Sequence, residues 1–274
     1  MASPYPTSQS FKSGGKPRRL IVALPAYNEE KCLPPLLKKF RALFAKLPPE
    51  ANPIVIVVND GSRDRTAEVC EKIAKRMSLR LVNHEKNKGL GEAIKTGLRA
   101  ALEESTSDDD VIVCMDADDT HPPHYVIPMM HRIARGDDIV IASRYRPGSR
   151  QVGVPPHRML MSFGARILFQ IFLGLPGVRD YTCGYRAYRA SIIREAFEEY
   201  GDDLITRNGF ACTDQLLVNI ACLWNVKISE IGFVLRYDRK VGASKLNLGV
   251  TINETFKLLF DGRRKLRRAG VIDR

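Results

Sequence analysis

The sequence predicts an α/β fold, with a mainly parallel sheet flanked by helices in a single domain that ends in an amphipathic helix. Short apolar runs alternate with segments whose apolar residues recur at helical spacing. The runs are apolar at consecutive positions, which suits strands buried on both faces of a parallel sheet. Polar clusters follow four of these runs directly. Because ligands of open parallel sheets bind beyond the carboxyl ends of the strands, these clusters predict a binding site.

The first half of the chain contains the regular part of this pattern. We expect its strands at residues 20–24, 54–58, 79–82, 111–115 and 138–142. Apolar spacing predicts helices between them at residues 33–44, 66–77 and 94–102. After the fourth strand, Pro122 and Pro123 suit the first turn of a further helix.

The second half is less regular. Two helices are expected, an amphipathic one at residues 157–173 and another at 213–223, with a polar turn at 180–188 and a strand at 228–237. The last segment, residues 251–268, combines Phe256, Leu259, Phe260 and Leu266 with six basic residues. Such a helix lies on an anionic bilayer or packs on the core with a solvated basic end, and the sequence leaves both interpretations open.

No internal repeat or linker divides the chain. We expect a disordered tail at residues 1–17, which is rich in Ser, Pro, Gly and Lys, a folded domain at 18–248, and a basic amphipathic helix at 249–274. The tail lacks the apolar core of a secretory signal, and no run approaches the 18 apolar residues of a membrane span.

Charge and cysteine usage narrow the class of protein. The net charge of +12 predicts an anionic partner, such as a nucleotide, a phospholipid surface, a phosphorylated substrate or a nucleic acid, although a charge of this kind also serves solubility. The six cysteines form no C-x-x-C pair, which indicates a reducing compartment without disulfides or structural zinc.

The stretch from Val111 to Pro123 carries the most informative chemistry. Five apolar residues are followed by Asp116, Ala117 and Asp118. On extended backbone, residues two apart point to the same side, so Asp116 and Asp118 present two carboxylates to one point. Two carboxylates suit Mg²⁺, whose shell substrate phosphates complete. Taken alone, the pattern is also that of an acidic turn after a strand.

Several motifs occur in the order found in a known family. Pro25-Ala26-Tyr27-Asn28-Glu29, the segment from Asn59 to Thr66, and Asp116-Ala117-Asp118 resemble the inverting, nucleotide-sugar-dependent glycosyltransferases with the GT-A fold. Later stretches are similar to those of the dolichyl-phosphate mannose synthase and polyprenyl-phosphate glycosyltransferase family, namely residues 89–93, 121–123, 143–145, 180–188 and 242–246. The resemblance runs from about Leu20 to about Phe260.

This resemblance implies a GT-A catalytic domain over residues 18–248 and a donor site at the strand ends. The implied nucleotide-binding residues are Pro25, Ala26, Tyr27, Asn28, Glu29, Asn59, Asp60, Lys88, Gly89, Asp116, Ala117 and Asp118. Relatives often have two Asp where this chain has Asn59-Asp60, so the carboxylate of Asp60 is the one expected to accept hydrogen bonds. The implied ligands of a Mg²⁺ or Mn²⁺ cofactor are Asp116, Asp118 and, as a weaker ligand, Thr120. His121 is assigned no chemistry.

The acceptor side of the site follows from the same resemblance. Asp118, Arg144 and Arg158 are the implied catalytic residues, and the lipid phosphate is expected to bind Arg144, Arg158, Ser162, Arg239 and Lys245. Arginine can direct two donors onto one phosphate, although any one of these residues taken alone also reads as a surface cation. Because a phosphate monoester is already anionic, catalysis would rest on alignment and electrostatics, with inversion at the anomeric carbon.

The resulting hypothesis is metal-dependent transfer of a sugar, mannose from GDP-mannose in the first instance, onto dolichyl or polyprenyl phosphate at a membrane surface. Alternatives are another donor such as UDP-glucose, another acceptor, or a basic nucleic-acid-binding protein, against which the dispersed Arg and Lys residues speak. The expected location is cytoplasmic and peripheral, at the cytosolic face of a membrane (the endoplasmic reticulum in a eukaryote). Docking would use the lipid surface or small membrane subunits, and no nucleic acid.

Overall fold

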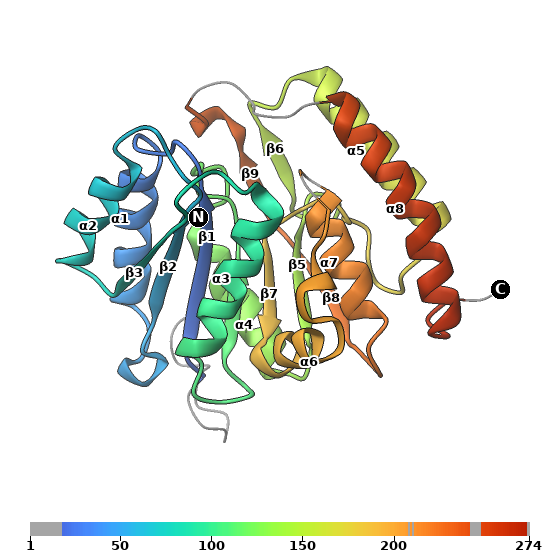
Figure 1. Cartoon of the computed structure of the whole chain (residues 1–274), viewed down its shortest axis with the longest axis horizontal. Helices are drawn as coiled ribbons and strands as arrows, with labels where there is room; N and C mark the ends of the chain where they lie inside the picture. The colour runs from blue at the N-terminus through green and yellow to red at the C-terminus, as the bar shows by residue number, and fades with distance from the viewer. Residues whose placement is uncertain (1–17, 208, 210, 242–247, 273–274) are drawn as a thin grey trace.

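A seven-stranded sheet forms the centre of the protein (Figure 1). The structure is a computed structural model that describes residues 18–272, apart from residues 208, 210 and 242–247. The strand order is β3-β2-β1-β4-β7-β5-β8. The strands are β1 Leu20–Ala26, β2 Ile54–Asn59, β3 Leu79–Asn83, β4 Val111–Cys114, β5 Ile139–Ser143, β7 Arg186–Arg189 and β8 Ile228–Gly232. A smaller parallel pair joins β6 Arg150–Val152 to β9 Val234–Arg236.

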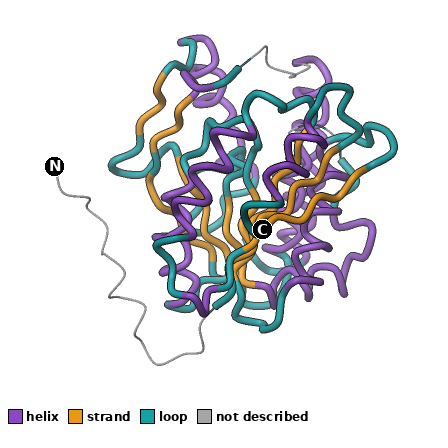
Figure 2. Tube along the Cα trace, turned by 90° about the vertical axis from the view of Figure 1, so that its left-hand side faces the viewer, coloured by secondary structure: helices purple, strands orange, loops and turns teal. Residues whose placement is uncertain are grey.

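Helices cover both faces of this sheet, as the tube in Figure 2 shows. They are α1 Leu33–Phe44, α2 Thr66–Ala74, α3 Leu90–Glu104, α4 Val126–Ala134, α5 Pro156–Phe172, α6 Ala190–Tyr200, α7 Ala211–Ala221 and α8 Leu248–Arg268. Short 3-10 turns lie at Pro49–Ala51, Pro123–Tyr125, Gly201–Leu204 and Tyr237–Arg239. Helix α3 packs on β1 and β2 and contacts α6 and α7, whereas α4 packs on β5, β7 and β8 from the other face (Figure 1).

The predicted mainly parallel sheet is confirmed, and its first five strands lie where the apolar runs predict them. β1, β2, β3 and β4 pair in parallel, as do β5 and β8. The central strand β7 was not predicted, because its sequence, Arg-Ala-Tyr-Arg, lies in the segment expected to be a polar turn. It runs antiparallel to both β4 and β5. Arg186 and Tyr188 of this strand are buried, and Arg186 donates to the backbone carbonyls of Thr213 and Tyr181, which an apolar pattern cannot reveal.

Three further elements differ from the prediction. The single strand expected at residues 228–237 is two strands, β8 and β9, which belong to different sheets and flank the fully buried Phe233. Helix α6 was not predicted. The helix expected after Pro122 and Pro123 begins as a 3-10 turn, and α4 follows it. The 1–17 tail lies outside the described residues, and the C-terminal helix is present as α8.

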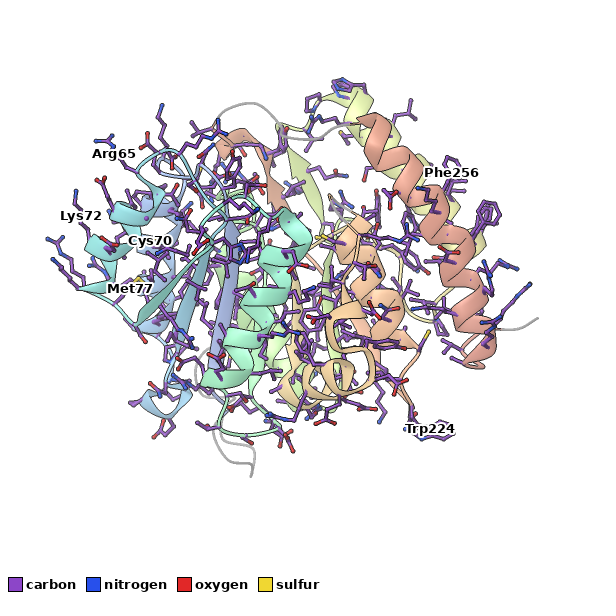
Figure 3. The ribbon with its side chains drawn as sticks, viewed as in Figure 1. Arg65, Cys70, Lys72, Met77, Trp224 and Phe256 are labelled. Atoms are coloured by element: carbon purple, nitrogen blue, oxygen red, sulfur yellow. The ribbon has the colours of Figure 1, made fainter. Side chains whose placement is uncertain are left out.

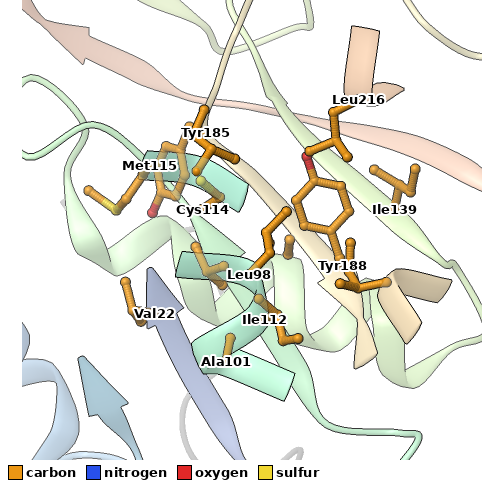
Figure 4. Close-up of a cluster of buried hydrophobic side chains, with 14 of the residues drawn as sticks. Val22, Leu98, Ala101, Ile112, Cys114, Met115, Ile139, Tyr185, Tyr188 and Leu216 are labelled. Atoms are coloured by element: carbon orange, nitrogen blue, oxygen red, sulfur yellow. The ribbon is translucent and has the colours of Figure 1, made fainter. Parts of the chain in front are cut away.

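The core fills the space between the sheet and its helices. Figure 4 shows Val22 and Ile112 from neighbouring strands packed beneath Leu98 of α3, with the rings of Tyr185 and Tyr188 on either side. All five side chains are at least 99% buried. Within the described residues, no helix has the length and apolarity that crossing a bilayer requires.

Helix α1 shows how the apolar pattern positions the edge of the sheet. Its buried residues recur at helical spacing, namely Leu33, Leu36, Leu37, Phe40 and Leu43, and proline occupies its first turn. This packing fixes the loop between β1 and α1, which carries Asn28 and Glu29, at the carboxyl end of β1.

We predict that Phe40→Ala lowers the free energy of unfolding by about 3–5 kcal/mol, because it removes a fully buried ring and leaves a cavity. The matched control is Arg41→Ala on the exposed side of the same helix, which should change that free energy by less than about 0.5 kcal/mol. Urea denaturation followed by circular dichroism measures both. Equal midpoints for the two variants would contradict the packing described for α1.

Candidate active site

The carboxyl ends of β2, β1 and β4 lie side by side and bring three polar segments together. Ala26 pairs with Asn59 at the ends of β1 and β2, and Ala23 pairs with Cys114 at the end of β4. The sequence predicted that such clusters would meet at one edge of the sheet. The loop after β1, the loop after β2 and the Asp116–Asp118 segment do meet there.

Side chains fasten the first two of these loops to each other. The backbone N–H of Asn28 donates to the hydroxyl of Ser62 at 2.9 Å, and the amide oxygen of Asn28 accepts from the N–H of Arg63 at 2.8 Å. Asn28 adopts a positive φ of 53°, a conformation that asparagine tolerates better than most residues. The N–H of Glu29 donates to Thr66 at 2.9 Å. The predicted nucleotide-binding loop is therefore fixed by cross-loop contacts.

Asp60 joins the loop after β2 to the start of α3. It is 3% exposed, and its carboxylate lies 2.7 Å from Nδ1 of His84. It also accepts from the backbone N–H groups of Lys88 at 2.8 Å and Gly89 at 2.9 Å. Both oxygens of Asp60 therefore bind donors of the protein itself. In this structure Asp60 orders the Lys88–Gly89 segment at the edge of the site.

The remaining predicted nucleotide residues lie around these loops. Asn59 is buried, donates to Asn83 at 2.8 Å and accepts from the N–H of Ser62 at 3.1 Å. The side chains of Pro25 and Tyr27 are half-buried, and that of Lys88 is exposed. Ala26 and Ala117 are buried. Gly61 has a φ of +65°, and a Cβ there would lie 2.4 Å from the backbone of Asn87. Only glycine allows this close approach of the two loops.

Asp116 and Asp118 lie just beyond the end of β4, and their electrostatic environments differ. Burial raises the pKa of Asp116, and the neighbouring carboxylate of Asp118 adds to this effect. Asp118 is also buried, which disfavours its charge, but the ammonium group of Lys240, the neighbouring His121 and the hydrogen bond from Thr120 together lower the pKa of Asp118. The Nζ atom of Lys240 lies 2.6 Å from Oδ2 of Asp118. The pair thus attracts a cation at this edge of the sheet.

The neighbours of this pair have structural contacts of their own. The hydroxyl of Thr120 donates to Oδ1 of Asp118 at 2.6 Å, so it orients the carboxylate. Asp119 turns away and forms an ion pair with Lys39 of α1. The ring of His121 stacks on Tyr185 with 5.1 Å between ring centroids, which agrees with its assignment as a packing residue.

Arg144, at the end of β5, forms a two-pronged pair with Asp180. Its Nε and Nη2 atoms donate to the carboxylate at 2.8 and 2.6 Å, and Nη2 also reaches the hydroxyl of Thr182 at 2.6 Å. The backbone N–H groups of Arg179 and Asp180 both donate to Glu230 of β8 at 2.7 Å. Arg144 is therefore held in place by Asp180, which begins the 180–188 motif but was assigned no role from the sequence.

A continuous set of contacts connects the acidic pair to the predicted acceptor residues. Lys240, which touches Asp118, also lies 5.7 Å from the ring centroid of Tyr237. The hydroxyl of Tyr237 accepts from Nη1 of Arg158 at 2.8 Å. One helical turn further along α5, Ser162 lies 2.8 Å from the hydroxyl of Tyr145, the residue that follows Arg144. The residues assigned to donor and acceptor by sequence thus border one site.

The structure adds little to the prediction for two of the acceptor residues. Arg239 lies in the 3-10 turn Tyr237–Arg239, next to Lys240. Lys245 falls outside the described residues.

The sequence analysis missed Asp180, Tyr237 and Lys240. All three lie in stretches that it singled out or next to them, but polar residues in irregular segments give no signal of their partners. Lys240 is separated from Asp118 by 122 positions along the chain.

The donor set suits a divalent cation. Asp118 already binds a cationic group at 2.6 Å, and the carboxylate of Asp116 lies beside it. Within residues 18–272, as far as described, no cluster of three His, Cys, Asp or Glu side chains could hold a metal by itself. A cation here would therefore take further ligands from a substrate, as Mg²⁺ does with phosphates.

Comparison with known proteins places this site in a family. The profile described as glycosyl transferase family 2 matches residues 21–197. The undecaprenyl-phosphate mannosyltransferase of Micrococcus luteus is 33% identical, over 85% of this chain and 89% of its own length. The polyprenol monophosphomannose synthase of Mycolicibacterium smegmatis is 32% identical, over 93% and 92%. The dolichol-phosphate mannosyltransferase of Pyrococcus furiosus is 30% identical, over 93% of this chain but 66% of its own length.

Solved structures agree with the fold. Glucosyl-3-phosphoglycerate synthase from Mycobacterium tuberculosis, in complex with Mn²⁺ and UDP-glucose, superposes with a TM-score of 0.65 at 19% identity, covering 99% of this chain and 86% of that one. At this identity the likeness concerns the fold, a mostly parallel sheet flanked by helices. Together with the family match over the strand-end loops and the relatives of about 30% identity, it leads to one conclusion: this chain is a glycosyltransferase and belongs to glycosyl transferase family 2.

Proposed function

We propose that this glycosyltransferase moves mannose from GDP-mannose onto dolichyl or another polyprenyl phosphate, in a metal-dependent and inverting reaction at a membrane surface. The observation that supports this most is the continuous set of contacts from Asp118 through Lys240 and Tyr237 to Arg158. It combines a carboxylate pair suited to a metal-bound diphosphate with cationic groups suited to a second phosphate. The named activities of three relatives support mannose and a prenyl phosphate acceptor.

In this proposal Asp116 and Asp118 hold Mg²⁺ or Mn²⁺, with Thr120 orienting Asp118. When bound, the cation neutralises charge that builds on the departing diphosphate. The loops at Asn28–Glu29 and Asn59–Asp60, with Lys88 and Gly89, border the nucleotide. Hydrogen bonds of Asn28 and Asp60 hold these loops in place, which lowers the cost of ordering them around the donor.

Arg144, Arg158, Ser162 and Arg239, with Lys245, bind the acceptor phosphate in this account. Its anionic oxygen attacks the anomeric carbon, so no side chain has to remove a proton. The bond from that carbon to the diphosphate breaks as the new bond forms on the opposite face, which inverts the configuration. Arginine suits this task because its planar group offers paired donors to phosphate.

A location at the cytosolic face of a membrane, through the basic surface of α8, is part of the proposal. The exposed basic residues of α8 are Lys257, Arg264, Lys265, Arg267 and Arg268. A row of such cations is attracted to anionic lipid.

A direct test of the reaction uses the purified protein with Mg²⁺ or Mn²⁺, a polyprenyl phosphate and a panel of GDP- and UDP-sugars. We expect a mannolipid from GDP-mannose, with the inverted anomeric configuration by NMR. UDP-glucose is the alternative donor, because the fold neighbour binds it. A glucolipid formed in preference to a mannolipid would contradict GDP-mannose as the donor. Retention of the anomeric configuration would contradict the single inverting displacement.

Asp118→Asn should abolish cation binding and lower kcat/KM about 100-fold or more, because a neutral amide is a poor metal ligand and leaves the leaving group's charge unbalanced. Asp119→Asn is the matched control one residue away, since Asp119 pairs with Lys39 instead. Electron paramagnetic resonance of Mn²⁺ measures binding separately from activity. Equal Mn²⁺ binding by the two variants would rule out Asp118 as a ligand.

Arg158→Ala should raise KM for the polyprenyl phosphate by about tenfold or more and leave KM for the sugar nucleotide unchanged, because a charge-assisted hydrogen bond to the acceptor is lost. Arg135→Ala, an exposed cation at the end of α4, controls for the change in net charge. Steady-state kinetics with each substrate varied in turn gives both constants. If only KM for the sugar nucleotide rose, Arg158 would be assigned to the nucleotide and not to the acceptor phosphate.

A further inference from the structure

Helix α5 exposes an apolar side that no part of the described chain covers. Phe169 is the only buried residue between Pro156 and Phe172. Leu160 is 73% exposed, Phe163 47%, Ile167 44% and Ile171 64%. These four recur at intervals of three and four residues, so they form one stripe along the helix. A stripe of this size on a soluble protein marks an interaction surface.

The opposite side of the same helix borders the active site. Arg158 donates to Tyr237, Ser162 lies 2.8 Å from Tyr145, and Phe169 packs on Tyr181 with 5.3 Å between ring centroids. The helix thus carries polar site residues on one side and bare apolar residues on the other. The sequence predicted an amphipathic helix here, but its apolar side faces outward.

Helix α8 lies beside α5 and extends this surface (Figure 1). Leu259 and Leu266 are fully buried, whereas Phe256 is 45% and Phe260 59% exposed. Figure 3 shows Phe256 pointing outward from α8. Phe260 packs edge-to-face on Phe172 at the end of α5, with 5.3 Å between ring centroids. One side of the basic helix therefore packs on the core, as one of the two interpretations of its sequence expected, and its other side is exposed.

Arginines border the apolar part of the surface. Arg263 donates to the carbonyl oxygens of Ile171 and Phe172 at 3.0 and 2.9 Å, which caps the C-terminus of α5. A surface hollow of about 500 Å³ is lined by Phe260, Arg263, Arg264, Arg267 and Arg268. Guanidinium groups match the geometry of phosphate and of carboxylate, so this cluster suits an anionic ligand such as a lipid phosphate.

We propose that the outer sides of α5 and α8 form one docking surface for an anionic bilayer, with the stripe from Leu160 to Ile171 inserted among the acyl chains and the arginines of α8 at the lipid phosphates. The argument for lipid is the combination of unpaired apolar side chains with adjacent arginines, which is the composition of helices that lie in a membrane interface. The stripe spans about 16 Å, because Leu160 and Ile171 are eleven positions apart and an α-helix rises about 1.5 Å per residue.

What docking does for the reaction rests on the proposed function, in which the acceptor is a polyprenyl phosphate. With α5 in the interface, Arg158 and Ser162 on its inner side lie at the depth of the lipid head groups. A polyprenyl phosphate could then present its phosphate to the site while its chain stays in the bilayer. The docking surface would thereby select a membrane-bound acceptor.

Tryptophan fluorescence tests insertion directly, because the chain has a single tryptophan, Trp224. This residue is 92% exposed on the loop after α7, away from Phe256 in Figure 3. In a Trp224→Phe background we introduce Leu160→Trp and add vesicles of phosphatidylcholine and phosphatidylglycerol. The emission should shift to the blue and be quenched by brominated acyl chains, whereas Trp224 in the unaltered chain should show neither effect. An unshifted, unquenched Leu160→Trp variant would overturn the proposal.

Vesicle flotation tests how much the apolar stripe and the arginines each contribute to lipid binding. The double variant Leu160→Ser with Ile171→Ser should bind these vesicles about tenfold or more weakly, because two exposed apolar anchors are lost, whereas Trp224→Ser should bind like the unaltered chain. Arg264→Gln with Arg268→Gln should reduce binding only when phosphatidylglycerol is present, against Lys72→Gln with Lys75→Gln on α2 as the charge-matched control. Unweakened binding of the serine variant would contradict the proposal, as would sedimentation showing that the stripe pairs two copies of the chain.

Failure of this inference is distinguishable from failure of the proposed function. Vesicle binding requires no sugar nucleotide, so it is measured independently of transfer. On a short-chain, water-soluble polyprenyl phosphate without vesicles, the serine variant should transfer sugar at the rate of the unaltered chain. If the unaltered chain transferred nothing to this acceptor but still inserted Leu160→Trp, the proposed reaction would fail and the docking surface would stand.

Discussion

The architecture of the site depends on placing two carboxylates together at the end of a buried strand. Asp116 and Asp118 follow β4 in the middle of the sheet, where burial opposes their ionisation and each carboxylate opposes the other. Such an arrangement needs positive charge. Lys240 supplies it at 2.6 Å from Asp118, Thr120 adds a hydrogen bond, and a divalent cation with a diphosphate would satisfy the same demand.

The rest of the site follows from the position of this pair in the sheet. The neighbouring strand ends carry loops that hydrogen bonds of Asn28 and Asp60 hold in place, and in the proposed function these loops border the nucleotide. On the other side, Tyr237 connects Lys240 to Arg158 of α5. Helix α5 thereby connects the site to the protein surface. Its inner side borders the site, and its outer side exposes apolar residues that no described part of the chain covers.

The parallel part of the fold was readable from sequence because it consists of uniformly apolar strands such as β1 and β2. β7 was not, because Arg186 is fully buried yet polar, and its guanidinium donates to the backbone carbonyls of Thr213 and Tyr181. Only the fold reveals such partners. The strand-end motifs predicted which loops meet at the carboxyl edge of the sheet, and those loops do meet there. Contacts such as Lys240 with Asp118 bring together residues 122 positions apart and leave no local pattern. Likewise, periodicity identified α5 as amphipathic without showing which side faces outward.

The central claim is that Asp116 and Asp118 hold the cation that grips a sugar nucleotide's diphosphate. Anomalous diffraction from crystals grown with Mn²⁺ and GDP tests it most directly. The account predicts an anomalous peak in contact with both carboxylates and with the diphosphate, and displacement of Lys240 from Asp118. A diphosphate bound elsewhere, or a peak that touches neither carboxylate, would contradict it.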